Sequence, residues 1–206
     1  MVATTSWMIK NNYPLPLILD LIDSIGKKKV FTKMDLRWEY NNVRIKKWKA
    51  AFSMPEGSFE PMVIFFELTN SPATFQTMMN NLLRDLVVEK KIAVFIDDVI
   101  VAMETEEGHD EIVEEVLRRL EENDLFVKPE KYVWKIREVE FLGVIIGKNG
   151  VKMEKEKVQG VIEWPVPKSV KDVQKFLGLA NYYRQFVKDF AKIVRLLHEM
   201  MRKENK

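Results

Sequence analysis

Two adjacent aspartates, Asp97 and Asp98, stand between two short apolar runs at residues 92–94 and 99–101. Runs rich in Val and Ile are typical of buried strands, so we expect the pair at a tight turn between two strands. Carboxylates beside a buried β-rich core cost several kcal/mol per ion, roughly, unless positive charge neutralises them. A divalent cation is the usual source of that charge. The sequence therefore predicts a hairpin with a candidate metal site at its turn.

A simpler interpretation is that Asp97 and Asp98 only form a hairpin turn, because Asp is common where a chain reverses. A second acidic site favours the metal site. Residues 30–36 form another short apolar strand, which carries Asp35 near its end. Three carboxylates from two strands can hold a pair of magnesium ions, which phosphoryl transfer uses to activate an attacking oxygen and stabilise a leaving one. The candidate catalytic and metal-binding residues are Asp35, Asp97 and Asp98.

Length and composition exclude several classes of protein. The chain has 206 residues, 47% of them hydrophobic, which is enough for a buried core and a smaller appended domain. It has no cysteine, which excludes disulfides and Cys-ligated metal sites and fits an intracellular compartment. No apolar run reaches the roughly 20 residues that span a bilayer, and the N-terminus lacks a signal-peptide pattern. We expect an intracellular protein, in the cytoplasm or nucleus, with no membrane partner; its oligomeric state stays open.

The net charge is only +2, but the charges are unevenly distributed. Residues 104–124 carry ten acidic and two basic side chains, whereas residues 168–206 carry ten basic and four acidic ones. The basic C-terminal segment could follow a phosphate backbone. On charge alone, the solvated face of a helix is the favoured interpretation.

Strand and helix patterns alternate along the chain and give way to a helical tail. Apolar spacing and turn residues predict, in order, a helix at 18–25, strands at 30–36 and 43–45, a loop at 54–58, and helices at 71–86 and 112–120.

The last third of the chain is predicted to begin with a hairpin and to end in helices. Residues 139–146 and 151–153 are expected to pair around a turn at 147–150. Ser169, with Asp172 three residues later, is typical of a helix N-terminus. His109 and His198 belong to no motif, and we expect each to be a surface or capping residue.

Six short motifs occur in a fixed order along the chain: Ile9-Lys10-Asn11-Asn12-Tyr13-Pro14-Leu15-Pro16, Phe31-Thr32-Lys33-Met34-Asp35-Leu36-Arg37, Leu68-Thr69-Asn70-Ser71-Pro72-Ala73-Thr74-Phe75-Gln76, Phe95-Ile96-Asp97-Asp98, Val139-Glu140-Phe141-Leu142-Gly143 and Phe176-Leu177-Gly178-Leu179-Ala180-Asn181-Tyr182-Tyr183-Arg184. In this order they resemble the reverse transcriptase of gypsy-like (Metaviridae) long-terminal-repeat retrotransposons, over nearly the whole chain. A lone Asp-Asp pair is a weak signal, whereas the full set is a strong one.

The resemblance implies an α+β fold. A palm, in which an antiparallel sheet is backed by helices, is expected at residues 31–157, and a helical thumb at 158–206. Residues 1–30 would be a remnant of the fingers and the entry to the palm. The implied activity is RNA-directed DNA polymerisation on an RNA or DNA template, in which a primer 3′ hydroxyl attacks the α-phosphate of a deoxynucleoside triphosphate. Asp35, Asp97 and Asp98 would hold two Mg²⁺ ions, with Mn²⁺ as a possible substitute.

The resemblance also implies roles for residues outside the aspartate set. Tyr40 matches the aromatic gate that selects deoxynucleotides, and three residues match the lining of the nucleotide pocket: Phe66, Phe75 and Gln76. The hairpin that grips the primer matches Phe141, Leu142 and Gly143. Taken without the resemblance, Tyr40, Phe141 and Leu142 could equally be packing residues. Four residues are expected to contact the nucleic-acid backbone from the thumb: Lys168, Lys171, Lys175 and Arg184.

Three departures from the family pattern bear on activity. The chain begins only a few residues before Tyr13, so we expect most of the fingers to be missing. Glu39 and Glu67 stand where glycines are usual, and each adds bulk and negative charge near the expected phosphates. Residues 44–49 form a shorter loop than in the family. We therefore expect a truncated polymerase domain of doubtful activity; the alternative is a non-catalytic nucleic-acid-binding relic of such an element.

Overall fold

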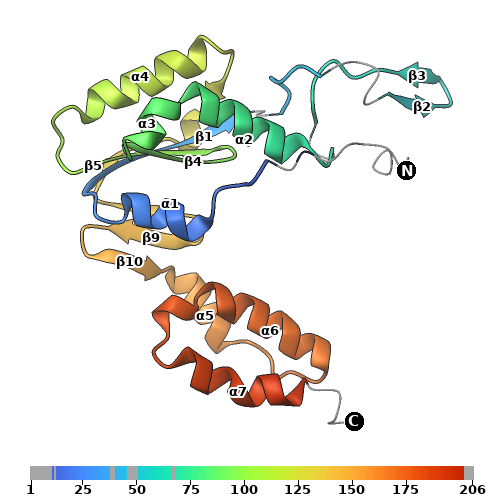
Figure 1. Ribbon diagram of the computed structural model, residues 1–206, viewed down its shortest axis with the longest axis vertical. Coiled ribbons are helices and arrows are strands. Elements are labelled where there is room, and N and C mark those ends of the chain that lie inside the picture. Colours follow the sequence, from blue (N-terminus) through green and yellow to red (C-terminus); the bar gives the residue numbers. More distant parts are fainter. Residues whose placement is uncertain (1–10, 12, 38–39, 46–50, 66–67, 202–206) are drawn as a thin grey trace. The chain divides into compact units, whose positions relative to one another are not determined.

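The computed structural model describes residues 11, 13–37, 40–45, 51–65 and 68–201. The chain forms two compact units, one made of residues 1–139 and 146–150 and the other of residues 140–145 and 151–206 (Figure 1). Within the described ranges, no helix has the length and apolar character that a membrane crossing needs.

A sheet centred on β1 (Val30–Arg37) forms the core of the first unit. Strand β1 pairs antiparallel with three neighbours, which places it at the centre of the sheet. The other strands are β4 (Ile92–Phe95), β5 (Asp98–Met103), β6 (Phe126–Val127) and β7 (Val133–Ile136). The order is β4-β5-β1-β6, and β7 also pairs with β1. The sheet predicted around Asp35 and the Asp97-Asp98 hairpin is thus confirmed.

Helices α2 (Ser71–Leu82), α3 (Arg84–Val88) and α4 (His109–Glu121) lie on one side of this sheet, whereas α1 (Ile18–Ile25) lies next to β4 (Figure 1). Because successive residues of a strand point to opposite faces, Met34 and Leu36 point toward the helices and Asp35 toward the other face. The core that Met34 and Leu36 join includes Phe75, Met79, Leu83, Ile92, Val94, Val99, Val101, Val113, Val116 and Leu120.

Three local predictions for the first unit are corrected. The strand predicted at 43–45 is only an isolated bridge between Arg44 and Val63. The loop predicted at 54–58 is the tip of a hairpin, β2 (Phe52–Met54) and β3 (Gly57–Phe59), in which the rings of Phe52 and Phe59 stack 5.8 Å apart. The helix predicted at 71–86 is divided at Leu83, whose φ and ψ of −115° and 19° are not helical.

His109 is fully buried, which corrects its prediction as a surface or capping residue. It is the first residue of α4, and its Nε2 atom lies 2.8 Å from the Thr32 hydroxyl on β1. Burial lowers the pKa of His109, so the ring is neutral near pH 7. The reason for the error is that a lone His before an apolar helix does not reveal a partner 77 residues away.

Strands β8 (Glu138–Phe141), β9 (Val144–Gly147) and β10 (Gly150–Met153) form a three-stranded sheet in the order β10-β9-β8. The single strand predicted at 139–146 is therefore two strands. Leu142 and Gly143 both adopt positive φ, 49° and 79°, and reverse the chain between them. The division between the two units passes through this sheet.

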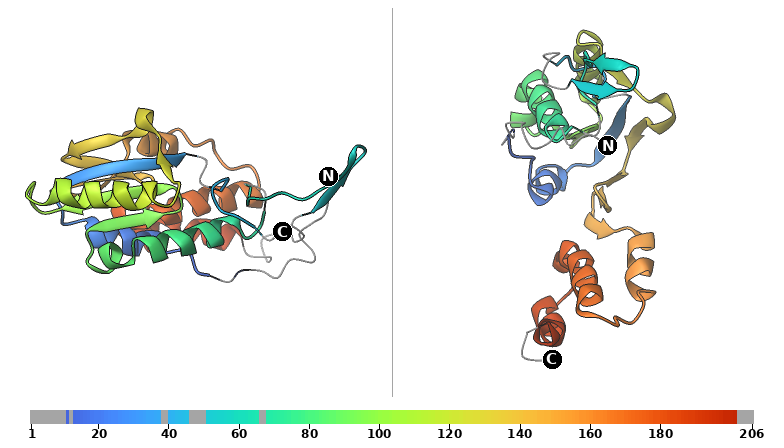
Figure 2. Two further views of the ribbon diagram at one scale, coloured as in Figure 1. Left: turned by 90° about the horizontal axis from the view of Figure 1, so that it is seen from above. Right: turned by 90° about the vertical axis from the view of Figure 1, so that its right-hand side faces the viewer.

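The second unit continues with α5 (Lys155–Ile162), α6 (Val170–Tyr182) and α7 (Phe190–Met200), as Figure 2 shows from two further sides. Ser169 caps α6, as predicted, because its side chain accepts a hydrogen bond from the Asp172 backbone N–H. A small core joins α6 to α7 and consists of Val173, Leu177 and Val194, with Phe190, Leu197 and Met201 packed against it.

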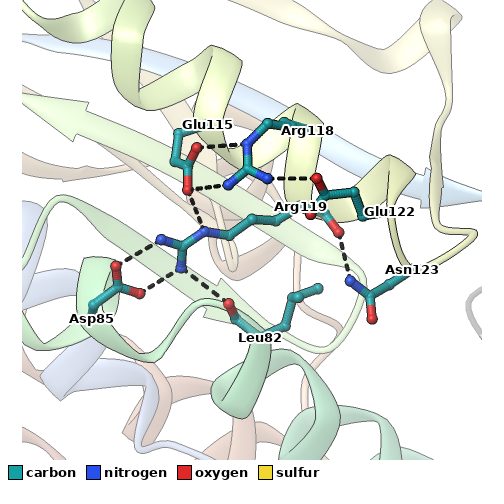
Figure 3. A network of polar contacts seen from close by, with 7 residues as sticks. All are labelled: Leu82, Asp85, Glu115, Arg118, Arg119, Glu122 and Asn123. Carbon is teal, nitrogen blue, oxygen red and sulfur yellow. Dashed lines mark hydrogen bonds and ion pairs between the residues drawn. The ribbon is translucent and has the colours of Figure 1, made fainter.

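Arg119 of α4 joins α4 to α3 through an ion-pair network (Figure 3). Its guanidinium donates to both carboxylate oxygens of Asp85, at 2.5 and 2.8 Å, and to Glu115 at 2.6 Å. It also donates to the Leu82 carbonyl at 3.1 Å. The hydrogen bonds from Arg119 and from its neighbour Arg118 lower the pKa of the Asp85 and Glu115 carboxyls to about 2.

We predict that Arg119→Met lowers the stability of the first unit at neutral pH but not in acid. Both carboxyls have depressed pKa values, so their contribution is complete above their unfolded pKa values of 3.8 and 4.5 and is lost as the pH falls toward 2. Urea unfolding of both proteins between pH 7 and pH 2 measures the difference. Arg84→Met, which removes an exposed charge from α3, is the matched control. A difference between wild type and Arg119→Met that does not depend on pH would contradict the prediction.

Candidate functional site

The pairing of β1 with β5 brings the three predicted aspartates to one end of the sheet. In the antiparallel register, Asp35 of β1 stands directly opposite Asp98 of β5. Asp97 lies in the two-residue loop between β4 and β5, and its carbonyl accepts a hydrogen bond of 3.0 Å from the Leu36 N–H. Asp35 and Asp97 both act electrostatically on the Asp98 carboxyl. Two strands far apart in the sequence therefore bring the three aspartates to the same end of the sheet.

The loop that carries Asp97 has a strained backbone. Its first residue, Ile96, has a φ of 53°, and a β-branched residue rarely adopts positive φ. Positive φ at the first loop position is what a two-residue hairpin of type II′ requires, and Gly is the residue usually found there. Ile at this position costs about 1–3 kcal/mol, which the surrounding structure must offset.

Gln76 of α2 holds this strained loop from the helix side of the sheet. Its side chain is fully buried. The side-chain carbonyl accepts a hydrogen bond of 2.7 Å from the Ile96 N–H, and the side-chain amide donates to the Val94 carbonyl at 3.2 Å. The amide also donates to Asn80, which in turn donates to the Tyr13 hydroxyl at 2.8 Å. A buried amide with this many partners fixes the position of the loop.

Lysines neutralise two of the three carboxylates. Lys128 and Lys131 donate to separate oxygens of Asp35, the second at 2.8 Å. Lys128 and Lys131 belong to the turn around the short 3₁₀ helix η2 (Pro129–Lys131), and the Lys128 N–H also donates to the Asp35 carbonyl. Lys33, two residues before Asp35 on the same face of β1, has its ammonium 3.4 Å from an Asp98 carboxylate oxygen.

The two paired carboxyls respond differently to their surroundings. Burial raises the pKa of Asp35, but the hydrogen bonds from Lys128 and Lys131 outweigh it, so the net pKa is lowered. Burial also raises the pKa of Asp98. There, the attraction of Lys33 does not compensate for burial and for the charges of Asp97 and Asp35, so the net pKa is raised.

The chemistry of the donor set fits magnesium, because all three side chains offer carboxylate oxygens. The ammonium groups of Lys33, Lys128 and Lys131 already neutralise Asp98 and Asp35. Among the residues that the structure describes, no three Asp, Glu, His or Cys side chains converge as a ready metal-binding group. The lysine ammonium groups pair with the carboxylates of Asp35 and Asp98.

Three of the residues predicted for nucleotide binding pack beside the sheet that carries the aspartates, and the fourth lies outside the residues that the structure describes. Tyr40 is 7% exposed, and its ring meets that of the fully buried Phe75 edge to face at 5.9 Å. Gln76 holds the Ile96 loop. Phe66, like Glu39 and Glu67, lies outside the described residues. The pocket assignment of these side chains stays a prediction.

The predicted primer grip and backbone contacts belong to the second unit. Phe141 is fully buried at the end of β8, and Leu142 and Gly143 form the turn to β9. The four predicted cations are all exposed: Lys168, Lys171, Lys175 and Arg184. Lys175 is 3.7 Å from Asp172, and at that exposure the pair is weak. These cations are accessible to a phosphate backbone.

Sequence reasoning missed the three lysines and the supporting role of Gln76. The alternation of strand residues could have placed Lys33 on the face of Asp35. Lys128 and Lys131 carry no such signal, because they reach Asp35 from 93 and 96 residues away. The clamp made by Gln76 depends on helix packing that a single sequence does not show.

The sequence matches the family described as "Reverse transcriptase (RNA-dependent DNA polymerase)" over residues 3–146. It is 36% identical to the retrovirus-related Pol polyprotein from transposon gypsy of Drosophila melanogaster over 96% of this chain and 19% of that protein. It is 37% identical to the Pol polyprotein from transposon opus of the same species, over 94% of this chain and 20% of that protein. The chain thus spans about a fifth of the length of these relatives.

Solved structures show the same similarity. The foamy viral protease-reverse transcriptase in complex with an RNA/DNA hybrid matches 94% of this chain and 26% of its own, with a TM-score of 0.80 and 26% identity. A form of the same viral protein (dRH) in complex with double-stranded DNA matches 94% of this chain and 34% of its own, with a TM-score of 0.85 and 26% identity. The similarity confirms the predicted α+β reverse-transcriptase fold.

We predict that Gln76→Met destabilises the first unit by about 2–4 kcal/mol, because it leaves the buried Ile96 N–H and Val94 carbonyl without their partner. Met keeps the side chain's length and volume, so packing changes little. Urea unfolding measures the effect. Asn81→Met, at an exposed position of the same helix, is the control and should change stability by less than about 0.5 kcal/mol. Equal stabilities of the two variants would contradict the clamp.

Proposed function

This chain belongs to the reverse transcriptase (RNA-dependent DNA polymerase) family, and we propose that it is the polymerase domain of a long-terminal-repeat retrotransposon polyprotein. In this role it extends a primer 3′ end with deoxynucleotides on an RNA or DNA template. One observation carries the proposal: the register of β1 and β5 places Asp35 opposite Asp98 and beside the Asp97 loop. The domain works inside the cell, in the cytoplasm or nucleus.

Asp35, Asp97 and Asp98 would hold two Mg²⁺ ions, or Mn²⁺ in their place. Bound there, the ions activate the attacking oxygen and stabilise the charge of the leaving group. The chain's own part is to keep the carboxylates in place without metal. Lys33, Lys128 and Lys131 balance the charge of Asp98 and Asp35. Ammonium groups released from these carboxylates would be available to attract a triphosphate. The Gln76 clamp keeps the Asp97 loop fixed.

Tyr40 serves as the gate against a ribose 2′ hydroxyl in this proposal. The edge-to-face contact with Phe75 fixes the Tyr40 ring from behind. Phe75 is fully buried, so it acts on the nucleotide through Tyr40, and Gln76 acts through the Ile96 loop. Phe66 belongs to the same proposed pocket.

The second unit is proposed to hold the template–primer duplex. The turn of Phe141, Leu142 and Gly143 lies on the primer, and the exposed cations of the helical segment contact phosphates without reading sequence. The similarity to proteins solved in complex with an RNA/DNA hybrid and double-stranded DNA supports a nucleic-acid partner. The backbone-contacting residues are Lys168, Lys171, Lys175 and Arg184.

A second candidate is a non-catalytic nucleic-acid-binding relic. It is favoured by the pairing of both Asp35 oxygens with lysines, which makes metal binding compete with two ion pairs. Glu39 and Glu67, which stand where the family pattern has glycine, also favour the relic. Duplex binding without nucleotide incorporation is the behaviour expected of such a relic.

We predict that the protein extends a labelled DNA primer on an RNA template when Mg²⁺ and deoxynucleotides are present. The double variant Asp97→Asn, Asp98→Asn should abolish extension, because amides cannot replace two metal-binding carboxylates. Asp20→Asn, at an exposed position of α1, is the control and should extend like the wild type. Failure of the wild type to extend the primer, with duplex binding intact, would favour the relic over the polymerase.

We predict that Lys171→Gln together with Lys175→Gln weakens duplex binding equally for all sequences. The slope of log K against log salt concentration should fall by about 2, because two phosphate contacts are lost. Fluorescence anisotropy of a labelled duplex across a salt series measures the slope. Lys188→Gln with Lys192→Gln removes the same charge from the same unit and is expected to leave the slope closer to that of the wild type. Identical slopes for both pairs would contradict the assignment of Lys171 and Lys175.

A further inference from the structure

We propose that the hydroxyl groups of Tyr182 and Tyr183 position the turn at Leu142 and Gly143 and thereby set how long the primer strand stays bound. The inference rests on the proposed function, which assigns this turn to the primer. All four residues belong to the second unit. The two tyrosines would act through the turn, as positioning residues, and not on the reacting atoms.

The turn needs outside support because its backbone is unfavourable for one of its two residues. Leu142 and Gly143 both have positive φ, 49° and 79°, as a two-residue loop of type I′ requires. Gly adopts this conformation readily, but Leu carries a Cβ that crowds the following carbonyl. A turn of this kind keeps its shape only when other groups hold its backbone.

Two successive tyrosines supply that support by binding two successive carbonyls. The Tyr182 hydroxyl donates a short hydrogen bond to the Leu142 carbonyl, and the Tyr183 hydroxyl donates to the Gly143 carbonyl at 3.4 Å. The two rings meet edge to face with centroids 4.8 Å apart. Tyr182 is the last residue of α6, and Tyr183 is its C-cap, so the helix end fixes both rings.

Gly143 is fitted to the tyrosines as well as to the turn. A Cβ built at this position would lie 3.0 Å from the Tyr183 hydroxyl oxygen and 3.7 Å from a ring carbon of Tyr182. A side chain at this position would push against the Tyr183 hydroxyl and would also be strained by the positive φ. The Phe-Leu-Gly and Tyr-Tyr motifs, 40 residues apart in the sequence, form one structural feature.

The surroundings keep both tyrosines as hydrogen-bond donors. Burial raises the pKa of Tyr182 and of Tyr183, and the charge of Glu154 raises both further. Glu154 is itself 8% exposed, and burial and the nearby Glu140 raise its pKa. The hydroxyls thus keep their protons throughout the pH range in which a polymerase works.

The experiment compares Tyr182→Phe, Tyr183→Phe and the double variant with the wild type. Each change removes one hydroxyl and keeps the ring, so packing is preserved. We expect the double variant to release a template–primer duplex about tenfold faster, from the loss of two net hydrogen bonds. The single-turnover extension rate at saturating duplex should stay within about twofold, because affinity differences between related complexes lie mostly in dissociation. Tyr132→Phe, which removes a hydroxyl from the first unit, is the matched control.

Gly143→Ala tests the same contact by adding a Cβ close to the Tyr183 hydroxyl. Gly143→Ala should weaken duplex binding, both through the positive φ and through the 3.0 Å approach of the new Cβ to the Tyr183 hydroxyl oxygen. Tyr183→Phe should therefore cost less binding in the Gly143→Ala background than in the wild type, because it also removes that close approach. Equal losses in the two backgrounds would overturn the proposed contact.

Hydrogen exchange at the Leu142 and Gly143 amides separates this inference from the proposed function, because it needs no duplex. Exchange should be faster in the double Phe variant than in the wild type. Unchanged exchange in a folded variant would overturn the positioning role, whatever the duplex data show. Faster exchange in a protein that binds no duplex would keep the positioning role and reject only its link to a primer.

Discussion

The antiparallel pairing of β1 with β5 is the constraint on which the proposed site depends. Its register puts Asp35 opposite Asp98, and the same strands carry apolar residues toward α2 and α4 on the other face. A shift of one residue would turn Asp35 toward the helices and Met34 toward the site. The burial of the core and the position of the carboxylates are therefore fixed by the same register, so the hydrophobic effect indirectly places the proposed metal-binding residues.

Charge balance explains how such a site can exist in a folded protein without metal. Asp35 is 6% exposed, and a carboxylate so buried needs positive partners. Lys128 and Lys131 provide the positive charge. Their turn is fixed to β1 by a hydrogen bond from the Lys128 N–H to the Asp35 carbonyl. The ion pairs stabilise the unliganded protein, and they also oppose metal binding. If Asp35 binds metal as we propose, its two ion pairs with lysine compete with that binding.

The local parts of the fold could be predicted from the sequence, and the non-local parts could not. Apolar spacing predicted α1 and β1, and the Asp pair predicted the β4–β5 hairpin, because periodicity and turn residues are signals in the local sequence. The residues around the aspartates were missed wherever they come from far along the chain, as with Lys128. The burial of His109 was missed for the same reason, since its partner Thr32 lies on another element. The acidic pair and the apolar strand before Asp35 identified the aspartates from the sequence, but not the lysines that balance their charge.

Two of the strained turns of this chain are held in the same way. The Ile96 loop and the turn at Leu142 have positive φ at a residue that bears a Cβ. The first carries a proposed metal ligand, and the second is proposed to contact the primer. In each case, a helix from another part of the sequence supplies the support: Gln76 binds the first turn, and Tyr182 and Tyr183 bind the second. Relaxing either turn would move the proposed site residues, whereas glycine at Ile96 or Leu142 would remove the strain and also widen the choice of conformations. The polar side chains therefore select one conformation of each turn, which backbone preference alone does not.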